Sequence, residues 1–171
     1  MKPFQGCNLK THKVIVILLL LFSASGCALI RPQTKHRIFT SEKYFHLGEK
    51  LPDNILNVKS RLMTLAYSAQ MLTCYRIVCK GILFDYGVNE KGVVEFIATE
   101  DVKFRTQNGY AVKTSYGEIS EVLKVTTKCE PGWAYYIQLD EGWSIGFVIG
   151  HYVTERPPKD DDRITFFFQR K

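Results

Sequence analysis

WAYYIQLDEGWSIGFVI, at residues 133–149, is the stretch that carries the clearest fold signal in the chain. Its apolar side chains alternate with others on both sides of a polar centre, at Trp133, Tyr135, Ile137 and Leu139 and again at Ile145, Phe147 and Ile149. A period of two is typical of a half-buried strand, and residues 140–142 supply a turn between the two runs. The stretch predicts a β-hairpin that follows a type II turn at Pro131-Gly132 and points Trp133 inward.

Other strand-like runs lie on both sides of this hairpin. They are rich in β-branched and aromatic residues or alternate with charged ones, and a glycine-bounded turn at 87–92 separates the first two. Bounded runs of this kind favour strands. The runs span 77–86, 93–98, 102–106 and 164–168.

Two helices are expected beside the sheet. Asp53 is a suitable N-cap, and apolar residues then recur at helical spacing, which predicts an amphipathic helix over 54–72. Ser115 and Glu118 have the spacing of a capping box, which predicts a short second helix. The expected fold class is therefore α+β, an antiparallel sheet with both helices packed on one face. The helical positions in 54–72 are Ile55, Val58, Leu62, Leu65, Ala66, Ala69 and Leu72.

The N-terminal residues have the pattern of an export signal. Lys2, Lys10 and Lys13 precede an unbroken apolar run at 14–22, and small residues follow at 23–26. A basic segment, a short apolar segment and a small-residue cleavage site are the parts of a secretory signal peptide. A permanent membrane span is the alternative, but it needs about 20 apolar residues, more than this run has.

Ala24-Ser25-Gly26-Cys27 resembles the lipobox of bacterial lipoproteins. The resemblance implies cleavage between Gly26 and Cys27 and attachment of palmitate-type lipid chains to Cys27. Several acyl chains would hold the protein firmly, whereas one alone binds only marginally. Ala28 is not the Asp of the family's inner-membrane retention signal, so the resemblance implies an outer-membrane lipoprotein that faces the periplasm.

Three segments follow from these signals: a signal peptide at 1–26, a lipidated N-terminus and tether at 27–52, and one folded domain at 53–171. Removing the signal leaves 171 − 26 = 145 residues, the size of one domain. It also removes three of 23 basic residues and none of 17 acids, so the net charge becomes 20 − 17 = +3. The remaining basic residues are scattered, and a nucleic acid is not expected as a partner.

Cys74, Cys79 and Cys129 remain as disulfide candidates in an oxidising compartment. The favoured pair is Cys74–Cys79 across the exit of the helix. On one extended strand these Cα atoms would be about 16 Å apart, beyond the roughly 7 Å limit for a bridge. The pair therefore requires a turn, and without one Cys129 becomes the partner. No histidine lies near the set, and no metal site is expected.

No catalytic constellation is evident in the mature chain. His36 and His46 lie in the expected tether, and His151 has no Gly-x-Ser-x-Gly elbow to serve. The acidic pairs at 100–101 and 140–141 fit solvated turns, and the run at 160–162 lacks the spacing of an EF-hand. We expect a protein without enzymatic activity, cofactor or metal.

Aromatic residues in the hairpin are the remaining functional signal. Such residues serve equally as core packing or as anchors in a binding surface. Tyr136 and Trp143 do not follow the inward alternation, so they are the candidates for a binding surface.

The segment 104–147 resembles small outer-membrane assembly lipoproteins and the related β-lactamase-inhibitor fold. The shared plan is Thr106-x-x-Gly109, a capped short helix, and a strand with Trp133-Ala134-Tyr135. This resemblance implies a non-catalytic protein that binds another envelope protein or supports outer-membrane assembly. The second hypothesis is an inhibitor lipoprotein that blocks a hydrolase such as lysozyme.

Overall fold

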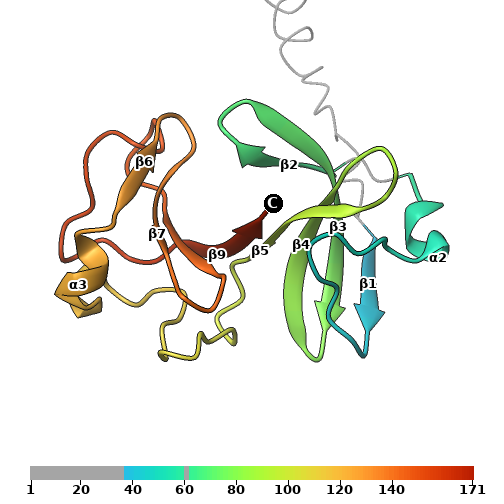
Figure 1. Cartoon of the computed structure of the whole chain (residues 1–171), viewed down its shortest axis with the longest axis horizontal. Coiled ribbons are helices and arrows are strands. Elements are labelled where there is room, and N and C mark those ends of the chain that lie inside the picture. The colour runs from blue at the N-terminus through green and yellow to red at the C-terminus, as the bar shows by residue number, and fades with distance from the viewer. Residues whose placement is uncertain (1–36, 60–61) are drawn as a thin grey trace, which may run out of the picture. The chain divides into compact units, whose positions relative to one another are not determined.

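Nine strands dominate the part of the chain that the computed structural model describes, residues 37–59 and 62–171 (Figure 1). They belong to one mixed sheet, and the helical elements are short. In chain order the elements are β1 (Ile38–Ser41), α2 (Asp53–Leu56), β2 (Leu62–Tyr67), β3 (Gln70–Cys79), β4 (Ile82–Val88), β5 (Val94–Thr99), the 3₁₀-helix η1 (Tyr116–Glu118), α3 (Glu121–Lys124), β6 (Lys128–Glu130), β7 (Ala134–Gln138), β8 (Ser144–Phe147) and β9 (Phe166–Arg170).

The sheet order is β1-β3-β4-β5-β9-β8-β7-β6, and β2 also pairs with β3. The β1–β3 pair is parallel and the other pairs are antiparallel. Strand β9 therefore joins two groups of strands, β1–β5 and β6–β8, as Figure 1 shows.

Each face of the sheet carries its own hydrophobic core. Side chains alternate across a strand, and β9 shows the result: Phe167 packs in the main core while Phe168 packs in the second core. The main core includes Tyr75, Ile77, Phe84, Tyr86, Ile137, Ile145 and Phe147. The second core consists of Ala66, Leu72, Phe96, Trp133, Ala134 and Phe168.

The expected amphipathic helix over 54–72 is wrong, and the α+β fold class with it. Among the described residues of this segment only 54–56, the end of α2, are α-helical, and the chain then forms the hairpin β2–β3 with a turn at 68–69. Leu62, Thr64 and Ala66 lie on one strand face, so a period of two also fits this segment. The pairing of β2 with β3 decides between the two patterns, since tertiary context overrides a local helical pattern.

Several local expectations are confirmed. The turn expected at 87–92 joins β4 to β5 through residues 89–93, and β7 pairs with β8 around residues 140–142. Gly132 has φ +74°, as a type II turn requires. Glu118 accepts hydrogen bonds from the Ser115 backbone N–H (2.7 Å) and hydroxyl (2.8 Å), although the helix it caps is a 3₁₀ turn.

Two strand limits differ from expectation. Residues 102–106 do not form a strand. The chain turns at 102–103, because the Asp101 carboxylate accepts the Lys103 N–H and the Asp101 carbonyl accepts the Phe104 N–H. The last strand lies two residues later than expected, as β9.

A further turn at Lys80-Gly81 divides the expected strand 77–86 into β3 and β4. Both turn residues have positive φ, 50° and 82°, and Cys79 pairs with Ile82 across the turn. Two positive φ values define the tight hairpin turn whose twist matches the strands it joins. Lysine rarely adopts this conformation, so a turn at Lys80-Gly81 is not expected from the residue types alone.

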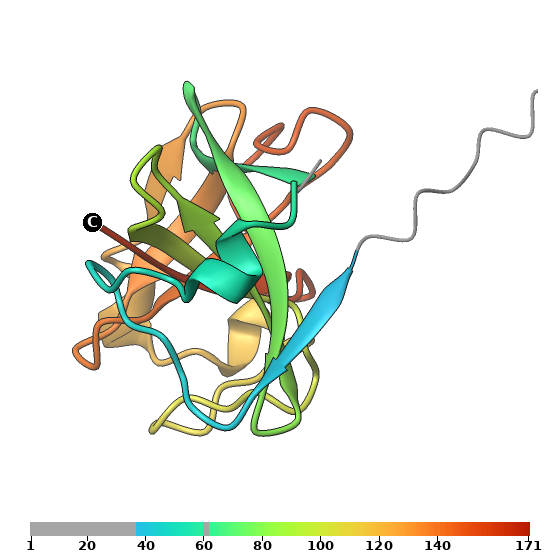
Figure 2. The ribbon, with the colours of Figure 1, turned by 90° about the vertical axis from the view of Figure 1, so that its right-hand side faces the viewer.

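The expected tether at 27–52 is wrong at its C-terminal end. Strand β1 pairs with Arg76–Cys79 of β3, and Phe45 and Leu51 are buried in the main core. Figure 2 shows β1 beside the strands of the β3–β4 hairpin. The fold therefore includes residues from 38 onward, because these apolar side chains are removed from water with the rest of the core. The signal peptide and the Gly26–Cys27 cleavage and lipid site lie outside the described residues. Within residues 37–59 and 62–171, no helix has both the length and the apolar character to cross a bilayer.

Candidate binding site around Arg170

Arg170, the last residue of β9, lies within an aromatic cage. Its guanidinium carbon is 4.3 Å from the ring centre of Tyr67, 4.7 Å from that of Trp133, 5.0 Å from that of Tyr136 and 5.4 Å from that of Phe168. A guanidinium within about 6 Å of an aromatic ring face is attracted by the ring's quadrupole. The cage therefore fixes the position of a cation on the second face of the sheet.

Glu130 at the end of β6 pairs with this cation. An Arg170 Nη1 hydrogen bonds to Glu130 Oε2 at 2.9 Å and to the Ala66 carbonyl at 3.3 Å, and the two charged side chains are 16% and 19% exposed. The Ser68 N–H donates to the other Glu130 oxygen at 2.7 Å. Burial raises the pKa of Glu130. The Ser68 N–H and the Arg170 guanidinium lower it by more than burial raises it, so the pKa lies below its usual value.

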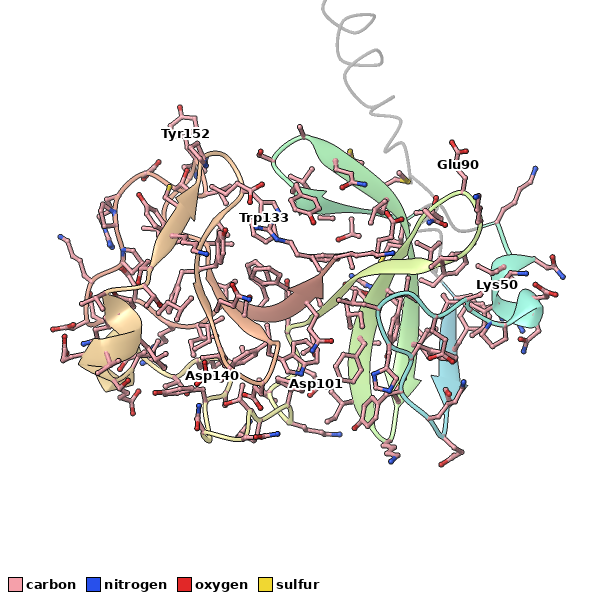
Figure 3. All side chains as sticks on the ribbon, in the orientation of Figure 1. Lys50, Glu90, Asp101, Trp133, Asp140 and Tyr152 are labelled. Carbon is pink, nitrogen blue, oxygen red and sulfur yellow. The ribbon has the colours of Figure 1, made fainter. Side chains whose placement is uncertain are left out.

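Trp133 forms the floor of the cage. It is 6% exposed, and its ring packs edge-on against Phe168 with centroids 4.9 Å apart. The indole N–H donates to the Leu65 carbonyl of β2 at 2.6 Å. Figure 3 shows Trp133 between β2 and β7, and the hydrogen bond accounts for that position. Trp133 and Arg170 thus connect β2 with the β6–β7 hairpin.

A pocket of about 220 Å³ opens beside Arg170. Ser144, at the start of β8, is 8% exposed, and its hydroxyl forms no hydrogen bond with any described residue. Ser144 lines this pocket, so water or a ligand can reach it. The pocket is lined by Tyr67, Tyr136, Gln138, Gly142, Ser144, Arg170 and Lys171.

The two aromatic candidates for a binding surface lie on opposite faces of the sheet. Tyr136 lines the pocket and packs against Trp133 and Phe168. Trp143 packs in the main core, with its ring 4.7 Å from that of Phe104. Trp133 is buried as expected, but it packs in the second core, with Tyr136. The expected alternation placed it on the same face as Ile137, which packs in the main core. Only Tyr136 belongs to the candidate site.

The favoured disulfide is wrong. Cys74 and Cys79 both lie in the extended strand β3, without the turn that a bridge between them requires. Cys79 is a buried thiol in the main core, 3.4 Å from the Tyr86 hydroxyl, and Cys129 is an exposed thiol in β6. The structure brings no two of the three cysteines together in a bridge.

Other polar groups on this unit form structural contacts. Arg76 and Asp85 form an ion pair at 3.1 Å beside a second pocket of about 280 Å³. In the same pocket the Asp101 carboxylate accepts hydrogen bonds from the backbone N–H groups of Leu83 and Lys103. His46 and His151 are exposed. Over residues 37–59 and 62–171, no group of three His, Cys, Asp or Glu side chains is arranged to hold a metal ion.

Arg170, Glu130 and Ser144 are site residues that the sequence analysis did not identify. They come from three strands, and only their pairing in the sheet brings them together. A lone arginine after a Phe-Phe-Phe-Gln run carries no local pattern that distinguishes it from a solvated residue.

Fold and site together define a mostly-β protein with a caged cation beside a small polar pocket. No protein-family model matches the chain, and a search of curated proteins finds no match. Among solved structures, the chain is similar to the uncharacterized protein YfeY from Escherichia coli. The two share 14% sequence identity with a TM-score of 0.47, over 79% of this chain and 100% of that one.

Proposed function

We propose that the chain is a lipid-anchored lipoprotein of the bacterial envelope, on the outer membrane and facing the periplasm, whose domain binds another envelope protein without catalysing a reaction. The observation that carries the proposal is the cysteine of the lipobox-like segment, Cys27, followed closely by a folded unit. A lipid on Cys27 would tie this unit to a membrane surface.

The distance from Cys27 to the fold limits where a partner can be. Ile38 begins β1, so 38 − 27 = 11 residue steps separate the lipid site from the sheet. Even a fully extended chain spans at most about 40 Å over that length. The expected tether to residue 52 would have reached more than twice as far. The partner is therefore a protein at, or close to, the same membrane.

The Arg170 site supports binding rather than catalysis. Arginine, tyrosine and tryptophan are the residues most enriched at interface hot spots, and all three meet here. The pocket is lined by groups that donate hydrogen bonds, and no His, Asp or Glu side chain lines it to act as a general base.

Lipidation is tested by labelling cells with radioactive palmitate. We expect Cys27→Ser to abolish incorporation and to leave an uncleaved or mislocalised precursor. Cys7→Ser is the matched control, because it removes a cysteine that the expected cleavage discards, and labelling should persist. Unchanged labelling of the Cys27→Ser protein would refute the anchor.

The partner is tested by crosslinking in intact cells and capture of the protein from detergent-solubilised envelopes. An assembly or structural envelope protein in the crosslinked product supports the proposal. Capture of a muralytic enzyme such as lysozyme would instead favour the inhibitor hypothesis. Absence of any crosslinked protein would contradict both.

A further inference from the structure

The pocket beside Arg170 presents hydrogen-bond donors that have no partner among the described residues. Nη1 of Arg170 is occupied by Glu130 and the Ala66 carbonyl, whereas its Nε and Nη2 form no hydrogen bond. The Ser144 hydroxyl, the Gln138 amide and the Tyr136 hydroxyl are likewise without a partner. Nε and Nη2 form the side-on fork that a carboxylate fills with two parallel hydrogen bonds.

The unpaired side of Arg170 favours an anion. No Asp or Glu side chain lines the pocket. Glu130 contacts Arg170 through Nη1, and the main-chain oxygen of Lys171 accepts from the Tyr67 hydroxyl, so neither group occupies Nε and Nη2. An anion would meet these two donors at a guanidinium that is already partly removed from water, where electrostatic attraction is stronger than in bulk solvent.

The size of the pocket favours a single functional group. Pockets that enclose whole small molecules typically measure about 300–1,000 Å³, and this one measures about 220 Å³. One carboxylate with a short stem fits such a space. A longer molecule would have to extend over the surface outside it, as a polypeptide does.

We infer that this pocket binds a carboxylate of the partner polypeptide, from an Asp or Glu side chain. The Nε and Nη2 of Arg170 donate to its two oxygens, and the Ser144 hydroxyl and Gln138 amide donate to the remaining lone pairs. The aromatic cage holds the guanidinium in place before binding, so little side-chain entropy is lost. This inference rests on the proposed function in one respect, that the partner is a protein.

The indole N–H signals of the two tryptophans provide a direct readout. The full-length protein in nonionic detergent, with ¹⁵N-labelled tryptophan, is titrated with a capped tripeptide that carries a central glutamate. Trp133 contacts Arg170, whereas the ring of Trp143 packs on the other face of the sheet. We expect the Trp133 signal to shift much more than the Trp143 signal, and Trp143→Phe assigns the two.

The matched peptide with glutamine in place of glutamate tests the charge. It has almost the same shape, and we expect its affinity to be at least about tenfold lower, because hydrogen bonds to an ionised acceptor are about twice as strong as neutral ones. Equal affinity of the two peptides would overturn the inference. So would the absence of a Trp133 shift at about 50 mM glutamate peptide, well above a millimolar dissociation constant.

Variants of the pocket lining test the location. Gln138→Glu places a carboxylate side chain in the pocket that would repel the peptide's glutamate, and we expect binding of the glutamate peptide to be lost. Ser144→Ala should weaken binding severalfold without altering the cage. Asn108→Asp adds the same charge on an exposed loop and should leave binding unchanged. If Gln138→Glu binds the peptide like the parent protein, the pocket is not the site.

The outcomes separate the carboxylate site from the proposed function. If a partner is crosslinked equally by the parent and by Gln138→Glu, the protein-binding function stands and the carboxylate site falls. If the glutamate peptide binds as expected but no envelope protein is crosslinked, the pocket is a site for small free carboxylates. The protein-binding function is then refuted, and so is the inference that the carboxylate belongs to a partner polypeptide.

Discussion

Arg170 connects distant parts of the chain through one guanidinium. It contacts Tyr67 from β2, Trp133 before β7 and Glu130 from β6, and its own strand lies between β5 and the β6–β8 group. Removing one partner of a largely buried ion pair is strongly destabilising, since the other charge then stays buried without a partner. The residues of this cluster are therefore expected to affect stability together.

Trp133→Ala should lower stability by about 3–5 kcal/mol, because the change removes a large buried ring and leaves a cavity. Trp133→Phe keeps most of the volume and loses the hydrogen bond to the Leu65 carbonyl, which contributes about 1 kcal/mol. Thermal melting monitored by circular dichroism checks the order of the two effects. If Trp133→Ala melts like the parent, Trp133 does not support the second core.

Glu130→Gln should alter how stability depends on pH. The folded-state pKa of Glu130 lies below its ordinary value of 4.5, so the charged form stabilises the fold above that pH. This contribution is lost as the pH falls from about 4.5 through the folded-state pKa. The difference in melting temperature between parent and variant should therefore be largest near pH 7 and should narrow toward pH 3. A constant difference would show that the charge of Glu130 is not involved.

At the scale of elements, β8 and β9 can pair closely because a glycine on β8 lies opposite an aromatic ring on β9. Gly146 pairs with Phe166, and a Cβ built at Gly146 would lie 2.5 Å from the Phe166 ring. That ring is held by Trp133 and Phe168, with centroids 5.8 Å and 5.5 Å away. The ring therefore has little room to move aside.

Gly146→Ala should destabilise the fold by about 1–3 kcal/mol, the range typical of overpacking. In a Phe166→Ala background the same change should do much less harm, because the obstructing ring is gone. Chemical denaturation of the four proteins gives the coupling energy. Additive effects would mean that the ring and the new methyl group do not meet.

The elements differ in how far the sequence determined them. The β7–β8 hairpin was predicted correctly because alternation and turn chemistry are local. The turn between the two strands is enough to pair Ile137 with Ile145. The segment 54–72 was predicted wrongly because its apolar residues satisfy both periods, and the contacts that select the strand come from distant residues. The hydrogen bond from Trp133 to Leu65 is one of these. Of the candidate site, only Tyr136 was found, since an aromatic residue off the inward face is visible in a pattern and a lone arginine is not.

At the scale of the whole molecule, the structure moves the start of the fold toward the N-terminus. A chain that starts at Arg37 should melt like the mature protein, whereas one that starts at Asp53 should melt far lower or fail to fold. The shorter chain lacks β1, Phe45 and Leu51, and loss of a buried Phe alone costs about 3–5 kcal/mol of the roughly 5–15 kcal/mol that keeps a domain folded. Calorimetry on both chains checks this. Equal melting temperatures would mean that residues 37–52 do not contribute to the stability of the fold, as expected of a tether.

The central place of β9 has a consequence for the timing of folding. A chain that is made, or passed through a membrane pore, from its N-terminus can pair β1 to β5 early and β6 to β8 later. Until β9 emerges, β5 and β8 each present an open edge, and such edges invite pairing with other chains. Pairing across long sequence separations is also slow. The nascent protein therefore passes through an interval of aggregation risk that ends only when Phe166–Arg170 are released and the two groups of strands become one sheet.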